Sequence, residues 1–305
     1  MAKAGQSGTD PGGSGTAPAE VADVATPVCL CADDFAISPA VTRGILEALA
    51  ARRLTATGAM TTRPHWRQAA RDFAALGADA DLGLHLNLTL GAPLTSMPRF
   101  APAAFPAVGR LLRAGKSELP LDEIAGEIAA QIEAFCAACG RAPDYIDGHQ
   151  HVQVLPGIRQ CLFEVLARKG LAGKLWLRDS GDRPVRILAR RSHLDKALGL
   201  AWLSRGFAAE AAARGFACNE GFAGYSDFRA DRDYGRQFAR YLVAPGRRHL
   251  IMCHPGHVDE ELARLDPVTE SREAELAFLL SERFSRLLEE SATRLARLSK
   301  ILIAQ

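Results

Sequence analysis

The chain has 305 residues, of which 48% are hydrophobic and 24% are charged, a composition typical of a globular protein with material for a large core. Its formal net charge of +2 at pH 7 gives no indication of a nucleic-acid partner. No apolar run approaches the ~20 residues that a membrane-spanning helix requires, so we expect no transmembrane segment.

The first 26 residues are rich in Gly, Ala, Ser and Pro and show little periodicity. Such a stretch buries too little apolar surface to offset chain entropy, so we predict a disordered tail over residues 1–26. It lacks the basic and then apolar pattern of a signal peptide. The seven cysteines lie mostly in apolar runs, as reduced thiols do. We therefore expect a cytoplasmic protein with a single domain over residues 27–305.

Strand and helix patterns alternate through the first half of the chain. The apolar run 28–32 predicts a buried first strand, and Ser38-Pro39 predicts a helix start, with Ser as N-cap and Pro at the first helical position. Residues 91–120 are aperiodic and rich in proline, which predicts a long and functional loop. Other strands are predicted at 55–60, 81–88 and 144–147, and helices at 38–53, 65–76, 121–139 and 156–169.

The second half contains a segment of a different character. Residues 182–215 interleave basic side chains with apolar ones, which predicts a basic and apolar helical insert. Strands are predicted around it and after it, at 175–178, 216–219 and 250–253. A helix is predicted at 231–242, and a continuous helical C-terminus at 271–298.

The alternation of the two patterns indicates the fold. The strands are continuous apolar runs, as in a parallel sheet covered by helices. Residues with chemical side chains come directly after strands, as they do at the carboxyl ends of barrel strands. We therefore predict an irregular (β/α) barrel of the TIM type with about seven strands. An open doubly wound sheet is the alternative, although the chain has no Gly-rich nucleotide loop to support it.

A metal site is predicted where three of the strands end. Asp33 or Asp34, His85 and His149 come from three different strand ends, and two imidazoles with one carboxylate leave coordination positions open for water and substrate. Adjacent aspartates point to opposite sides of an extended chain, so one would bind the metal and the other would accept a proton. His151 has the same strand parity as His149 and is the alternative ligand.

Four further residues are candidates for the same site. His254 follows the last strand and could protonate a leaving group. Arg178 follows the fifth strand and could hold Asp33 ionised or bind substrate. His151 and Asn87 are also predicted to contact the substrate.

Four sequence blocks resemble the signatures of one family. They read CADDF at 31–35, GLHLNLT at 83–89, DGHQHV at 147–152 and MCHP at 252–255. Their order and spacing are similar to those of the YdjC-like carbohydrate deacetylases. The resemblance implies a barrel related to polysaccharide deacetylases, one divalent metal ion and hydrolysis of N-acetyl groups on amino sugars. Zn²⁺ is the expected ion, with Mg²⁺ or another divalent cation as the alternative.

The resemblance also implies a role for each matching residue. Asp34, His85 and His149 would be the metal ligands, Asp33 the base and His254 the acid. The order of the two aspartates rests on the wider deacetylase pattern, so their exchange stays open.

Two departures from the family pattern point to a branch within it. Ala36 stands where the family usually has Gly, and the segment 182–215 and the helical C-terminus are unlike the shorter members. These features resemble the hopanoid-biosynthesis-associated (HpnK-like) branch, which implies N-acetylglucosamine carried on a hopanoid lipid. Peripheral contact of residues 182–215 with the inner face of the membrane would suit such a substrate.

Two other functions remain open on the residues alone. Asp and His clusters on barrels also serve metal-dependent phosphoesterases, which need further ligands for a second metal. A non-catalytic protein that binds lipid or glycan through residues 182–215 is the third hypothesis.

Overall fold

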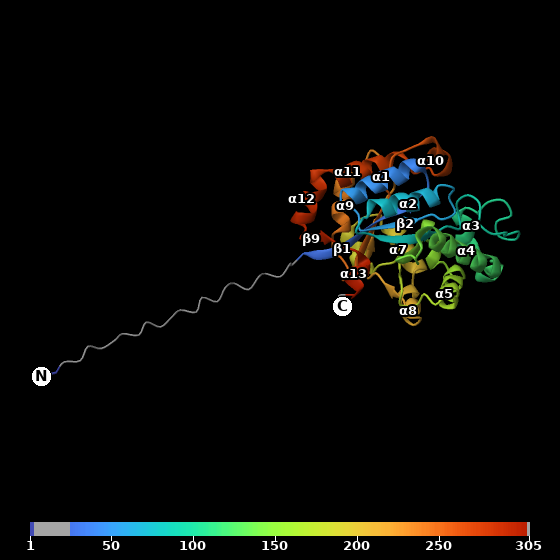
Figure 1. Cartoon of the computed structure of the whole chain (residues 1–305), viewed down its shortest axis with the longest axis horizontal. Helices are drawn as coiled ribbons and strands as arrows, with labels where there is room; N and C mark the ends of the chain where they lie inside the picture. The colour runs from blue at the N-terminus through green and yellow to red at the C-terminus, as the bar shows by residue number, and fades with distance from the viewer. Residues whose placement is uncertain (3–24, 304–305) are drawn as a thin grey trace.

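The computed structural model describes residues 1–2 and 25–303. Most of the tail predicted to be disordered, residues 3–24, lies outside the described residues. Residues 25–303 form one sheet with helices around it (Figure 1).

Parallel strands form a curled sheet, and the predicted (β/α) barrel is confirmed in this form. Eight strands lie in the order β6-β5-β4-β3-β2-β1-β8-β7, and a ninth, β9, pairs with the start of β1. Only residues 219–221 separate the two edge strands β6 and β7, so the sheet curls back toward itself. The strands are β1 (Thr26–Phe35), β2 (Ala56–Ala59), β3 (Asp81–Leu86), β4 (Tyr145–Gly148), β5 (Trp176–Leu177), β6 (Ala217–Cys218), β7 (Phe222–Ala223), β8 (His249–Cys253) and β9 (Thr293–Leu295).

Helices cover the outside of this sheet, and α4 packs against α5 and α2, α2 against α1, and α1 against α11. Ser38 caps α1 as predicted, because its Oγ accepts from the N–H of Val41 at 3.3 Å. The helices are α1 (Pro39–Ala50), α2 (Trp66–Leu76), α3 (Val108–Arg113), α4 (Leu121–Cys139), α5 (Ile158–Arg168), α6 (Pro184–Arg190), α7 (Leu194–Leu203), α8 (Phe207–Ala212), α9 (Tyr234–Tyr241), α10 (Glu260–Leu265), α11 (Glu270–Leu280), α12 (Glu282–Glu290) and α13 (Leu298–Ile303), with 3-10 turns at Lys116–Glu118 and His149–Val154.

The prediction of one helix over residues 271–298 is wrong. Ser281 adopts an extended conformation, with φ −79° and ψ 158°, and its Oγ caps α12 by accepting from the N–H of Phe284. After α12 the chain becomes β9, which pairs with the first three residues of β1. Strand pairing satisfies backbone groups at the start of β1, and it overrides the helical periodicity of the sequence.

The amino-terminal end of the sheet is closed by the C-terminal helix. Leu298 and Ile301 of α13 join the apolar cluster inside the sheet, and Arg297 bonds the buried Asp81 at 2.7 Å. Within that cluster the rings of Tyr145 and Trp176 stack at 4.1 Å. The carboxyl ends of the strands are therefore the end at which a site can open.

Residues 182–215 contain the three short helices α6, α7 and α8. Within the described residues no helix is both long enough and apolar enough to span a bilayer.

Candidate active site

The end of β1 brings two neighbouring carboxylates to one place. The pairing register between β1 and β2 shifts between Ala32 and Phe35, and Asp34 has a positive φ of 67°. This irregularity breaks the alternation of an extended strand, so Asp33 and Asp34 both line the same cavity. Ala36 also has a positive φ, 71°, which explains why a glycine suits that position.

Asp34, His85 and His149 form a buried group of possible metal donors. One donor atom from each lies within 4.8 Å of the other two. Asp34 Oδ1 is 2.9 Å from His149 Nδ1 and 3.4 Å from His85 Nε2. One carboxylate and two imidazoles suit a borderline cation such as Zn²⁺.

The surroundings of this group also suit a cation. His85 Nδ1 lies 2.7 Å from Asp147 Oδ1, a contact that orients the ring and leaves Nε2 toward Asp34. Burial by itself would lower the pKa of His85, but the carboxylates of Asp147 and Asp33 raise it to about 10. A position that stabilises positive charge on an imidazole also stabilises a metal cation.

Asp33 has a different partner, the buried guanidinium of Arg178. Arg178 donates to both carboxylate oxygens of Asp33, at 2.7 and 2.5 Å, and it also lies 2.5 Å from Asp147 Oδ2. Burial would raise the pKa of Asp33, but Arg178 holds that pKa well below its usual range. Asp33 is therefore ionised at neutral pH.

Cys31, Asp33 and Asp147 form a second group whose spacing would allow a metal ion. Arg178 lies among them, and its Nη2 is 3.0 Å from Cys31 Sγ. Because a guanidinium already serves these three groups, they do not form a second metal site.

His254 lies at the other side of the cavity, directly after β8. Its backbone N–H donates to Glu275 Oε2 at 2.6 Å, and its ring packs edge-on against Phe228 at 5.1 Å. Among the described residues, its buried Nδ1 has no hydrogen-bond partner.

The cavity that joins these groups has a volume of about 590 Å³. Its inner end carries the carboxylates and imidazoles described above. Apolar side chains from α3, α7 and several loops also line the cavity, beside the charged Asp195, Lys196 and Asp266. The apolar lining residues include Val108, Leu112, Leu155, Leu200, Leu203 and Val268.

Comparison with known proteins decides the family. The model of the family described as YdjC-like protein matches residues 27–290. The chain belongs to the YdjC-like family. A chitooligosaccharide deacetylase from Enterobacter sp. is 32% identical over 273 residues, which cover 87% of this chain and 94% of the relative. A chitooligosaccharide deacetylase from Salmonella paratyphi B is 29% identical over 270 residues, covering 86% and 94%.

A solved structure of a candidate cellobiose-phosphate cleavage protein from Enterococcus faecalis has the same fold. It superposes with a TM-score of 0.67 at 24% identity, covering 91% of this chain and 99% of that one. The match of the family model over residues 27–290 confirms the predicted resemblance to the YdjC-like family.

The predicted catalytic residues and metal ligands of this YdjC-like chain meet at one place. Asp33, Asp34, His85, His149 and His254 all line one cavity, although they come from four separate strand ends. The rings of His85 and His149 meet edge-on at 5.6 Å.

The strand parity predicted for His151 is wrong. Gln150 and His151 have positive φ values of 52° and 61°, because β4 ends at Gly148 and a tight turn follows. His151 therefore turns away from Asp34 and bonds Ser180 Oγ through Nδ1 at 3.1 Å. Burial lowers the pKa of His151 to about 3, so the ring is neutral. It lines the cavity but lies outside the group of three metal donors.

Arg178 and Asn87 are buried and do not line the cavity, so substrate contact by them has no support from this geometry. Asn87 shapes the turn after β3, since its Oδ1 accepts from the N–H groups of Thr89 and Leu90. Its Nδ2 donates to Thr62 and to the Leu90 carbonyl.

The contact of Asp147 with His85 and the burial of two charged residues, Arg272 and Glu275, are not predicted from the sequence. Asp147 stands in the predicted block 147–152, and its position one strand from His85 was the available signal. Arg272 and Glu275 lie on α11, where charged residues in a helical pattern usually face solvent.

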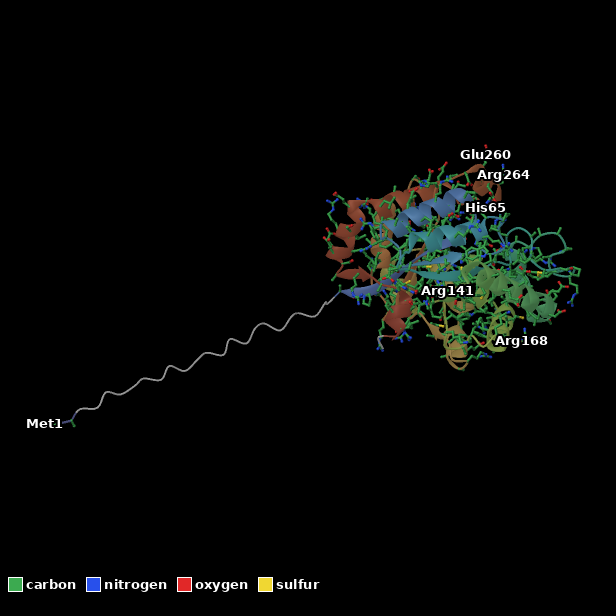
Figure 2. The ribbon with its side chains drawn as sticks, in the orientation of Figure 1. Met1, His65, Arg141, Arg168, Glu260 and Arg264 are labelled. Atoms are coloured by element: carbon green, nitrogen blue, oxygen red, sulfur yellow. The ribbon has the colours of Figure 1, made fainter. Side chains whose placement is uncertain are left out.

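One histidine lies away from this site. His65 lies at the outer surface near α10 (Figure 2), and its Nε2 bonds Glu261 at 2.8 Å. It takes no part in the site.

Proposed function

We propose that this protein removes the N-acetyl group from an acetylated amino sugar carried on a lipid. N-acetylglucosamine linked to a hopanoid is the expected substrate, and acetate and a free amine are the products. The observation that carries the proposal is the grouping of Asp34, His85 and His149 with Asp33 and His254 around one cavity.

The enzyme is a hydrolytic N-deacetylase that acts on carbohydrate, the class that the motifs predict. The relatives named chitooligosaccharide deacetylase match nearly their whole length, and the family model covers residues 27–290, which include every block of the site. The lipid, the metal dependence and the roles of single residues are the finer parts of the proposal.

Asp34, His85 and His149 would hold one divalent metal ion. When bound, such an ion supplies Lewis-acid activation of water and of the acyl oxygen. The donor set of one carboxylate and two imidazoles favours Zn²⁺ over Mg²⁺, which prefers oxygen ligands.

Asp33 and His254 would move the protons. Asp33 accepts a proton from the attacking water, whose oxygen forms a bond with the acetamide carbon. The carbon–nitrogen bond then breaks, and His254 donates a proton to the departing amine. Arg178 keeps Asp33 in its ionised form, ready to accept that proton. General acid and base groups of this kind contribute ~10²–10⁴ in rate each.

The apolar side chains that line the cavity support a lipid-linked substrate. A sugar headgroup would occupy the polar inner end, while Leu200 and Leu203 of α7 would contact the apolar portion. Beyond the cavity, α6 and α7 expose Val185 and Trp202, which are 71% and 73% accessible. Exposed apolar side chains among basic ones suit peripheral contact with an anionic membrane surface. A cytoplasmic location at the inner membrane face remains part of this proposal.

Acetate release tests this function directly. The purified protein is incubated with an N-acetylglucosaminyl hopanoid lipid in vesicles and, separately, with soluble chitooligosaccharide. Acetate and the free amine are measured by mass spectrometry. We expect acetate from both, with a higher kcat/KM for the lipid. Equal kcat/KM values would reject the lipid part, and no acetate from either would reject deacetylation.

Phosphoester hydrolysis fits the geometry less well. It calls for a second metal, and the second group of acidic donors is already bonded to Arg178. Release of phosphate from a sugar phosphate, without acetate from the acetylated sugar, would favour it. A non-catalytic binding protein would bind the lipid without any turnover.

A further inference from the structure

Two charged residues of α11 lie inside the protein rather than at its surface. Arg272 is 0% exposed and Glu275 is 2% exposed. They are three positions apart, so they share one face of the helix. Burying a charge is costly unless the group is paired. The groups that bond these two side chains therefore indicate their structural role.

Arg272 pairs with the carboxylate of Asp34. Its Nη2 donates to Asp34 Oδ2 at 2.7 Å and to Asp266 Oδ2 at 3.0 Å. Its Nε donates to the Val268 carbonyl at 2.9 Å, which fixes the plane of the guanidinium. Because Oδ2 of Asp34 is engaged, Oδ1 is the oxygen left beside His85 and His149.

Glu275 holds the loop that carries His254. Its Oε2 accepts from the His254 N–H at 2.6 Å. The Gly256 N–H donates to the Arg272 carbonyl at 3.2 Å, so α11 holds this loop at two points.

Helix α1 supports the same loop from another side. A Cβ on Gly44 would lie 2.7 Å from Gly256 Cα, so the backbones meet without room for a side chain. The backbone around His254 is therefore fixed between two helices.

We propose that Arg272 and Glu275 are positioning residues, which together set the spacing between Asp34 and His254. This inference rests on the proposed function, in which Asp34 holds the metal ion and His254 protonates the amine. Arg272 presents Asp34 as a ligand through a single oxygen, and Glu275 fixes the proton donor relative to it. One rigid helix thereby links two groups that lie 220 positions apart in the chain.

Arg272→Met tests the first half through metal affinity, which needs no turnover. Loss of a residue that orients a metal ligand typically costs 10–100-fold in affinity, so the Kd for zinc should rise by ~10–100-fold. Arg272→Lys, which retains the charge but only one donor group, should give an intermediate Kd. Arg264→Met, on the exposed surface of α10 (Figure 2), is the matched control and should leave the Kd unchanged.

Glu275→Met tests the second half through kcat. It removes the acceptor for the His254 N–H, and we expect kcat to fall ~10–100-fold while KM and the zinc Kd stay within about twofold. Glu275→Gln keeps a carbonyl acceptor and should restore most of kcat. Glu273→Met, at an exposed position of the same helix, is the matched control.

Folding of each variant is checked by circular dichroism and Tm. If the Met variants do not fold, Arg272→Lys and Glu275→Asp take their place. Arg272→Lys should still raise the Kd for zinc, and Glu275→Asp should still lower kcat. A folded Arg272 variant with wild-type zinc affinity, or a folded Glu275 variant with wild-type kcat, would overturn the inference. A wild-type protein without deacetylase activity would overturn the proposed function instead, and the zinc titration would still decide the role of Arg272.

Discussion

At the scale of single residues, the two neighbouring aspartates have different partners and therefore different roles. Asp33 is bonded to Arg178, whereas Asp34 lies beside His85 and His149. This difference favours Asp33 as the base and Asp34 as the ligand.

Asp33→Asn should therefore keep the metal ion and lose turnover. The amide cannot accept the proton, so we expect kcat to fall by ~10²–10⁴. Metal content is measured by elemental analysis and acetate by mass spectrometry. Asp231→Asn, on the exposed surface, is the control. Retained activity in Asp33→Asn would remove this residue as the base.

His149 and His151 offer a matched pair for the ligand assignment. Only His149 belongs to the group of three donors, while His151 bonds Ser180. His149→Ala should purify without metal, and His151→Ala should keep a full equivalent. The opposite pattern of metal content would reassign the ligand to His151.

Asp179, which follows Arg178, gives a prediction for pH dependence. Burial and the nearby Asp182 raise the pKa of Asp179 to about 6, above the ~3.9 of an unfolded aspartate. The folded state therefore binds this proton more tightly, and the resulting stability is present below about pH 4 and is lost as the pH rises through 6.

Asp179→Asn should remove that pH dependence. An amide oxygen can still accept from the Gly181 N–H, and no charge is buried. We expect the variant to gain ~2–4 °C in Tm over the parent at pH 8 and nothing at pH 4, measured by calorimetry. A gain of equal size at both pH values would show that burial of the charge is not the cause.

At the scale of elements, α7 connects the cavity to the outer surface. Leu200 and Leu203 line the cavity, while Leu198 and Trp202 are exposed. One short helix thus places apolar side chains both in the cavity and at the surface, as the proposed contact with a lipid-linked substrate and a membrane would require.

Leu198→Ser with Trp202→Ser should separate the two substrates. Burying a large apolar side chain is worth about 1.5–3 kcal/mol, so kcat/KM on lipid-linked sugar in vesicles should fall ~10-fold or more. Activity on soluble chitooligosaccharide should not change. Leu94→Ser is the control, because Leu94 is an exposed leucine on the loop between β3 and α3. An equal loss on both substrates would reject membrane contact by α7.

The strands also differ from one another in how well the sequence predicts them. The long apolar runs that became β1, β3 and β8 were predictable because each ends at a chemical motif. The pieces β7 and β9, of two and three residues, carry no periodic signal of their own. They form because neighbouring strands offer unpaired backbone groups, which is a property of the folded sheet.

At the scale of the whole molecule, the curled sheet brings distant residues together. His149 lies 115 positions from Asp34, and Arg272 lies 238 positions from it, yet both bond the same carboxylate. The histidines could be predicted because His85 and His149 stand at strand ends, within motifs that also carry other polar side chains. Arg272 and Glu275 could not, because only the packing of α11 against the strand ends reveals that these charges are buried. His151 was misassigned because a left-handed turn, not a strand, follows Gly148.

The measurement that tests the central claim most directly is anomalous diffraction from crystals grown with zinc. We expect one ion per chain, with the Asp34 carboxylate and the His85 and His149 imidazoles as ligands at about 2.0–2.2 Å. An ion bound elsewhere, or no ion at these three side chains at saturating zinc, would contradict the account.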